Sequence, residues 1–189
     1  MAFDDAKIEQ GVRLILEGIG EDPGRGGLKD TPGRVARMYR EICGGIDFDP
    51  ETLVTVVEGA DFVEMIMVRD IPLSSLCEHH MVPFNGRAHV AYIPNKSHQI
   101  TGLSKIARVV DTLSKRLQVQ ERLTTQIADA IDAALSPRGV FVVIEAEHLC
   151  MTMRGVKKPG STTVTSSVRG LFRTDARTRQ EAMDHIGMR

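Results

Sequence analysis

The order of helical and extended segments constrains the fold of this chain more than any other feature. A helical period of apolar residues marks five segments, which are 6–19, 32–43, 105–117, 121–135 and 175–186. Apolar alternation or β-branched residues mark four strand candidates, which are 62–69, 86–93, 140–154 and 162–168. No helix separates the two strands of either pair, so each pair is expected to run antiparallel. The pattern predicts the α+β class, with an antiparallel sheet and helices packed on one face.

Capping and turn residues predict where some of these elements begin. Thr31 is expected to be the N-cap of its helix, because Pro32 suits the first helical position. Ser104 is placed to cap the next helix in the same way. The pair Asn85-Gly86 has the composition of a tight turn and is predicted to be one.

Composition limits the partners and the compartment of the protein. A formal net charge of −1 over 189 residues gives no reason to expect nucleic acid or an anionic membrane as a partner. No apolar run has the length of a membrane span, and the acidic opening at residues 1–5 does not resemble a signal peptide. Three cysteines, an odd number, do not suggest a disulfide framework. We therefore expect a cytoplasmic protein with reduced thiols.

Two short segments combine the residue types that bind transition metals. Residues 77–80 read Cys-Glu-His-His, and a single turn could direct Cys77 and His80 at one ion. The segment 148–150 offers a histidine and a cysteine again. If residues 140–154 form one strand, its alternation places His148, Cys150 and Arg154 on the same face, with Thr152. Thiolate and imidazole ligands together favour zinc over magnesium or calcium.

The number of candidate ligands leaves two kinds of zinc site open. A structural zinc would take four ligands from the five candidates, which are Cys77, His79, His80, His148 and Cys150. A catalytic zinc would take three, and Cys77, His80 and Cys150 form a natural set. His79 and His148 would then be free for proton transfer beside the ion. Each residue alone has an ordinary interpretation as a buried thiol or a surface histidine, but the surplus of ligands favours the catalytic site.

Basic residues near these segments suggest an anionic ligand. Lys105 and Arg108 lie one turn apart at a helix start, where anions bind favourably, and Arg154 follows the second metal segment. Each of them alone is best explained as a solvated surface charge, and so are Arg34 and Arg37. Together, Lys105, Arg108 and Arg154 suggest a polyphosphate pocket near the metal.

Six segments in order resemble those of a known family, the GTP cyclohydrolase I enzymes. They cover nearly all of the chain and are 20–25, 30–34, 77–80, 102–105, 118–123 and 148–150. The resemblance implies the tunnelling fold, with an N-terminal helical region over 1–60 and a catalytic domain over 61–189. It implies zinc-dependent opening of the guanine imidazole ring of GTP, release of formate and closure to 7,8-dihydroneopterin triphosphate. It also implies a homodecamer of two pentameric rings, with each site built from adjoining subunits.

The resemblance assigns a role to each candidate residue. Zinc would be held by Cys77, His80 and Cys150. Proton transfer would fall to His79, His148 and Ser104. The substrate would be held by Gln120 and Glu121 at the guanine, and by Lys105, Arg108, Arg154, Arg34 and Arg37 at the ribose and triphosphate, with Arg34 and Arg37 coming from a neighbouring subunit.

Two other functions compete with this one. A non-catalytic, metal-stabilised nucleotide-binding module would have a closed four-ligand zinc and would bind GTP without turnover. A nucleobase deaminase would need His-x-Glu and a later Cys-x-x-Cys, which this sequence lacks.

Overall fold

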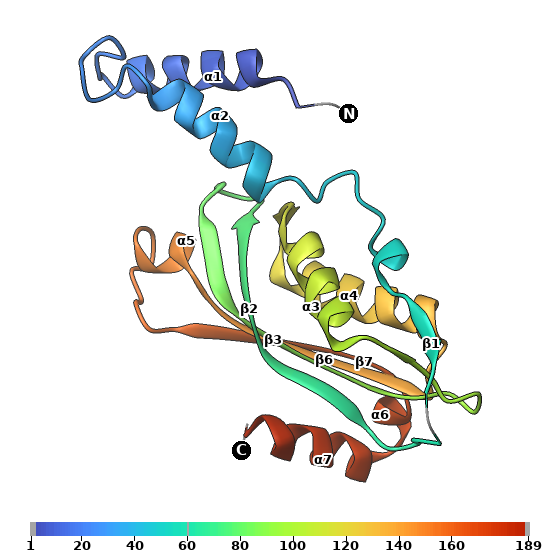
Figure 1. Ribbon diagram of the computed structural model, residues 1–189. Helices are drawn as coiled ribbons and strands as arrows, with labels where there is room; N and C mark the ends of the chain where they lie inside the picture. Colours follow the sequence, from blue (N-terminus) through green and yellow to red (C-terminus); the bar gives the residue numbers. More distant parts are fainter. Residues whose placement is uncertain (1–2, 60, 188–189) are drawn as a thin grey trace.

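The computed structural model describes residues 3–59 and 61–187. A five-stranded sheet forms its centre (Figure 1), in the order β5-β2-β3-β6-β7. The strands are β5 (Leu117–Gln118), β2 (Ile66–Cys77), β3 (Pro83–Ile93), β6 (Gly139–His148) and β7 (Thr162–Gly170). Every neighbouring pair is antiparallel except β2 and β5. The short strands β1 (Val56–Glu58) and β4 (Gln99–Thr101) pair separately.

Helices cover both faces of the sheet, unequally. The longer helices α3 (Leu103–Ser114) and α4 (Gln120–Leu135) pack on one face. The shorter α6 (Leu171–Thr174) and α7 (Ala176–Ile186) cover part of the other face (Figure 1). Strand β6 shows why both layers form, because Val140, Val142 and Ile144 face α3 and α4 while Phe141 and Val143 face α6 and α7. The predicted α+β class is confirmed, with α6 and α7 as an additional layer.

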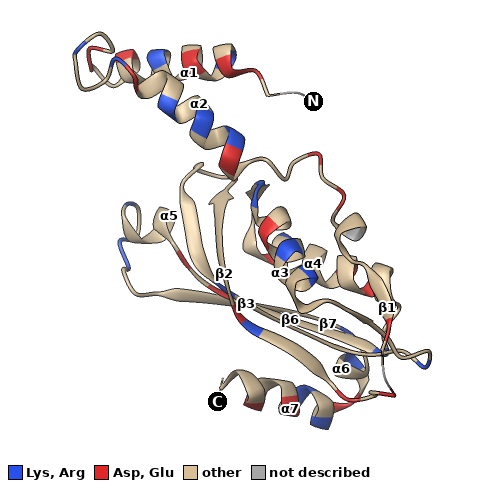
Figure 2. Ribbon diagram, in the orientation of Figure 1, with Lys and Arg blue, Asp and Glu red and all other residues tan. Residues whose placement is uncertain are grey.

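The N-terminal helices stand apart from this body. Helices α1 (Asp5–Gly18) and α2 (Thr31–Ile42) contact each other and project from the sheet (Figure 1). No described residue of α1 is buried, and the apolar side chains of Leu14, Ile15 and Ile19 are exposed. Both helices carry charges of both signs (Figure 2). The 3-10 turn η1 (Pro50–Leu53) connects this region to β1. No helix among the described residues is long and apolar enough to cross a bilayer.

Several predicted boundaries are wrong by a few residues. Asp30, not Thr31, is the N-cap of α2, and Gly102 rather than Ser104 precedes α3. Strand β2 begins at Ile66, not at residue 62. Asn85-Gly86 is no turn, since both residues lie within β3. A Cβ at Gly86 would lie 2.0 Å from the backbone oxygen of Glu145, so this glycine allows β3 and β6 to approach closely.

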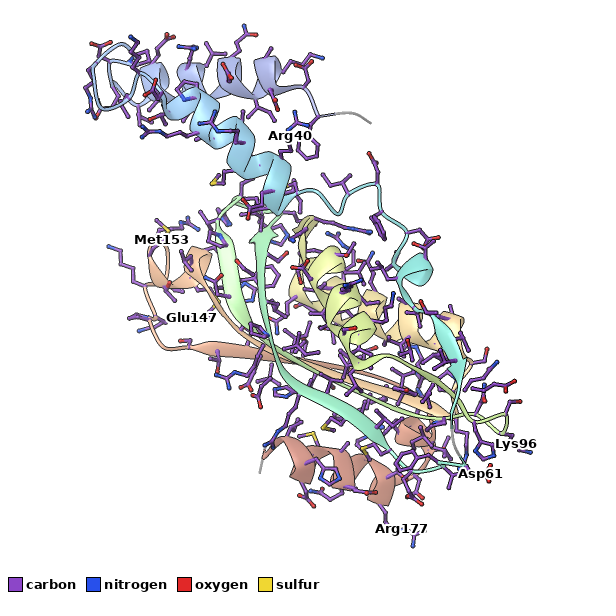
Figure 3. All side chains as sticks on the ribbon, viewed as in Figure 1. Arg40, Asp61, Lys96, Glu147, Met153 and Arg177 are labelled. Carbon is purple, nitrogen blue, oxygen red and sulfur yellow. The ribbon has the colours of Figure 1, made fainter. Side chains whose placement is uncertain are left out.

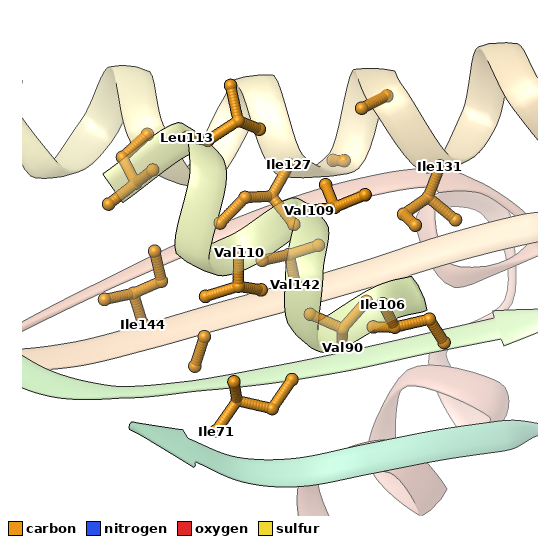
Figure 4. Packing of buried hydrophobic residues seen from close by; sticks show 14 of the residues in the cluster. Ile71, Val90, Ile106, Val109, Val110, Leu113, Ile127, Ile131, Val142 and Ile144 are labelled. Atoms are coloured by element: carbon orange, nitrogen blue, oxygen red, sulfur yellow. The ribbon is translucent and has the colours of Figure 1, made fainter. Parts of the chain in front are cut away.

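The main core lies between the sheet and the helices α3 and α4 (Figure 4). Ile127 of α4 is fully buried there. We expect Ile127→Ala to lower the free energy of unfolding by about 2–5 kcal/mol, because the lost methyl groups leave a cavity. Urea titration at fixed protein concentration measures this, with Thr125→Ala on the exposed side of the same helix as control. An equal effect of both variants would contradict this description of the core.

Candidate metal centre

The two metal-binding segments meet at one end of the sheet. Cys77 is the last residue of β2, and His80 lies in the turn that leads to β3. The backbone N–H groups of His80 and Met81 both donate to the Cys77 carbonyl, at 3.4 and 2.8 Å, and close this turn. Cys150 comes from α5 (Leu149–Thr152), which directly follows β6. Potential ligand atoms of Cys77, His80 and Cys150 all lie within 4.8 Å of one another.

The route by which Cys150 reaches this group differs from the prediction. Strand β6 ends at His148, so His148 and Cys150 do not share a strand face. His148 pairs with Phe84, the second residue of β3. Strand β3 begins one residue earlier, at Pro83, and offers β6 no partner residue before that. The chain therefore turns into α5 after His148. Met153, which follows α5, is 62% exposed and lies on the outer loop (Figure 3).

The donor set fits a zinc ion. Two thiolate sulfurs bound tetrahedrally to zinc at about 2.3 Å lie roughly 3.8 Å apart, a spacing compatible with the observed cluster. Burial raises the pKa of the Cys150 thiol, and the neighbouring Cys77 raises it further, against a lowering effect of Arg154. A bound cation would act in the opposite direction, because it stabilises the Cys150 thiolate. Arg154 donates to Nε2 of His80 at 3.0 Å, so it lies beside this group as expected.

His148 lies next to the metal-ligand group in a closely defined environment. Its ring stacks on Phe84, with centroids 4.7 Å apart and an interplanar angle of 11°. Its Nε2 lies 2.7 Å from Oε1 of Gln120. Burial lowers the pKa of His148, and the charge of Glu121 acts in the opposite direction. His79 is close to the cluster too, with Nδ1 3.8 Å from the Cys77 sulfur.

The structure does not bring every predicted site residue to the metal-ligand group. The backbone carbonyl of Ser114, at the end of α3, accepts a 2.6 Å hydrogen bond from Ser75, close to Cys77. Ser104 and Lys105 lie in the first turn of α3. At 1.5 Å per residue, Ser104 is about 15 Å from Ser114 along the helix axis. Within one chain the predicted polyphosphate pocket beside the metal is therefore not formed by α3.

The predicted arginines of α2 are also remote from the metal centre. Arg34 and Arg37 are exposed and line a polar hollow of about 390 Å³ between α1 and α2. Arg34 pairs there with Asp30 at 3.7 Å.

Several residues that hold the metal-ligand segments in place from neighbouring elements were not predicted from the sequence. Arg122 of α4 forms an ion pair with Glu78 and donates to the Leu117 carbonyl at 2.8 Å, so it ties the Cys77–His80 turn to α4. Phe84 of β3 and Thr165 of β7 were not predicted as site residues either. The strand register that brings them to the site has no signal in the local sequence.

Fold and site together define a class: an α+β protein whose sheet end carries a Cys/His/Cys group able to hold a metal ion, beside a half-buried histidine. A sequence model described as GTP cyclohydrolase I matches residues 8–187. GTP cyclohydrolase 1 of Carboxydothermus hydrogenoformans is 63% identical over 184 residues, covering 97% of this chain and 95% of that protein. GTP cyclohydrolase 1 of Mycobacterium ulcerans is 59% identical over 185 residues, covering 98% and 92%. The chain belongs to the GTP cyclohydrolase I family and is an enzyme of that family.

Proposed function

We propose that this enzyme opens the guanine imidazole ring of GTP by hydrolysis, releases formate and closes the product to 7,8-dihydroneopterin triphosphate. The observation that carries the proposal is the Cys77, His80 and Cys150 cluster with His148 beside it, in a chain that matches the family over nearly its whole length. The alternative of a non-catalytic module is not favoured, because the relatives at about 60% identity are named as cyclohydrolases.

Zinc would be held by the three clustered residues Cys77, His80 and Cys150. When bound, zinc acts as a Lewis acid and lowers the pKa of a water molecule to about 7. Three protein ligands leave a position free for that water.

The other residues bind the substrate and move protons. His148, which contacts Gln120 and is influenced by the charge of Glu121, would exchange a proton with a ring nitrogen of the guanine. The later proton transfers would fall to His79 and Ser104. Glu121 is exposed at the start of α4, where its carboxylate could accept from the N–H groups of a guanine edge. Arg154 would hold a phosphate near the metal.

A complete site requires more than one copy of the chain. Ser104, Lys105 and Arg108 lie on the first turns of α3 and are distant from their own metal cluster, and Arg34 and Arg37 are exposed on α2. A neighbouring subunit would supply these cations to the triphosphate, which agrees with a homodecamer of two pentameric rings in the cytoplasm. In this arrangement residues 1–60 form a helical region and residues 61–189 the catalytic domain.

The test is incubation of zinc-loaded protein with GTP, followed by assays for formate and for the fluorescent oxidised pterin. We expect both products in equal amounts. Tight GTP binding without formate from metal-replete protein would contradict the proposal and support the binding module instead.

A further inference from the structure

Gln120 is buried almost completely and all its polar atoms are engaged by the protein. The residue is only 1% exposed to solvent. The amide nitrogen lies 3.0 Å from the Ile144 carbonyl, 2.9 Å from the Thr163 carbonyl and 3.1 Å from the Thr165 hydroxyl. The amide oxygen faces Nε2 of His148 at 2.7 Å.

This environment permits one orientation of the amide. A flipped amide would place its oxygen against two carbonyl oxygens, which cannot donate. The hydroxyl groups of Thr124 and Thr165 agree with this orientation. The Thr124 hydroxyl donates to the backbone carbonyl of Gln120 at 2.7 Å, so it must accept from the Thr165 hydroxyl. Thr165 then has a lone pair left for the Gln120 amide. The oxygen of the Gln120 side chain is therefore the atom that meets His148.

The orientation of Gln120 in turn determines the hydrogen on His148. An amide oxygen only accepts, so Nε2 of His148 must carry a hydrogen and donate it. The parallel stack with Phe84 restricts the ring plane. In the neutral histidine, Nδ1 therefore carries no hydrogen.

We propose that Gln120 is a positioning residue, which holds His148 in the Nε2–H tautomer and directs Nδ1 to the reaction. The proposal rests on the proposed function and replaces the guanine contact that the family resemblance implies for Gln120. Both amide hydrogens are taken by backbone and hydroxyl oxygens, so Gln120 has none to offer a base.

The tautomer has a consequence for the proton balance. As water adds to C8 of the guanine, one of its hydrogens passes to Nδ1, and the imidazolium then returns a proton from Nδ1 to the guanine ring nitrogen as its bond to C8 breaks. His148 ends neutral, with Nε2–H still bonded to Gln120. The Gln120 oxygen stabilises the positive ring in between.

Gln120→Met tests the role by kinetics, since methionine keeps the side-chain length and removes the acceptor. We expect kcat for formate release to fall about 100-fold or more, with KM and the GTP dissociation constant within about threefold of wild type. Gln126→Met is the matched control, because it makes the same substitution on the same helix, but Gln126 bonds to Gln118 instead of His148. Unchanged kcat, or a tenfold weaker GTP affinity as the main effect, would overturn the proposal.

Nitrogen-15 NMR of histidine-labelled protein tests the tautomer directly, with the His148→Ala spectrum subtracted. We expect a protonated Nε2 and an unprotonated Nδ1 for His148 in wild type, and loss of this preference in Gln120→Met. A protonated Nδ1 in wild type would refute the proposal, even if Gln120→Met did not fold. Absence of formate from wild type would instead count against the proposed function and leave the NMR result standing.

Discussion

Cys150→Ala is expected to abolish both stoichiometric metal binding and formate release. Cys150 supplies one of three clustered ligands, and the remaining Cys77 and His80 cannot complete a three-ligand site. The loss of formate release should reach at least 10⁴-fold, on the order of what metal activation of water supplies. Elemental analysis of freshly reduced protein measures the metal, and the formate assay measures turnover.

Cys43→Ala is the matched control for this prediction. Cys43 is a cysteine of similar chemistry, 5% exposed, at the end of α2 and outside the metal-ligand cluster. We expect this variant to keep its metal and its activity. If Cys150→Ala retained one metal ion per chain, the ligand assignment would be wrong.

His148→Ala is expected to slow formate release about 10²- to 10⁴-fold, the range that general acid–base catalysis contributes. The metal content should not change, because His148 bonds to Gln120 and stacks on Phe84 and is not one of the clustered ligands. The variant therefore separates a proton-transfer role from a ligand role. Single-turnover measurements at saturating GTP, with elemental analysis of the same sample, give both quantities.

His185→Ala is the control for the histidine substitution. Its side chain is 57% exposed near the end of α7, and we expect wild-type turnover from this variant. Loss of the metal in His148→Ala would show that His148 is a ligand, and full activity would remove it from the mechanism.

Element types followed from local patterns, whereas several boundaries did not. The apolar stripes of α3 and α4 were predicted because each helix buries one face, and that face repeats every turn. The end of β6 was missed because it depends on the partner strand, since β3 begins at Pro83 and the ladder cannot continue past His148. The turn predicted at Asn85-Gly86 is wrong because glycine also serves where two backbones approach closely, and this use has no distinguishing signal in the local sequence.

The sequence by itself determined the chemistry of the metal centre, because the types of ligand and their spacing within each segment are local properties. It predicted Cys77, His80 and Cys150 as a ligand set, and the structure clusters these three side chains; it also predicted His148 as the neighbouring proton carrier. Only the tertiary structure decided how these side chains are held, since the β3–β6 register places Phe84 on His148 and the burial of Gln120 selects one amide orientation. Hydrogen-bond direction in a buried site depends on every neighbour at once, and these neighbours come from parts of the chain that are distant in sequence.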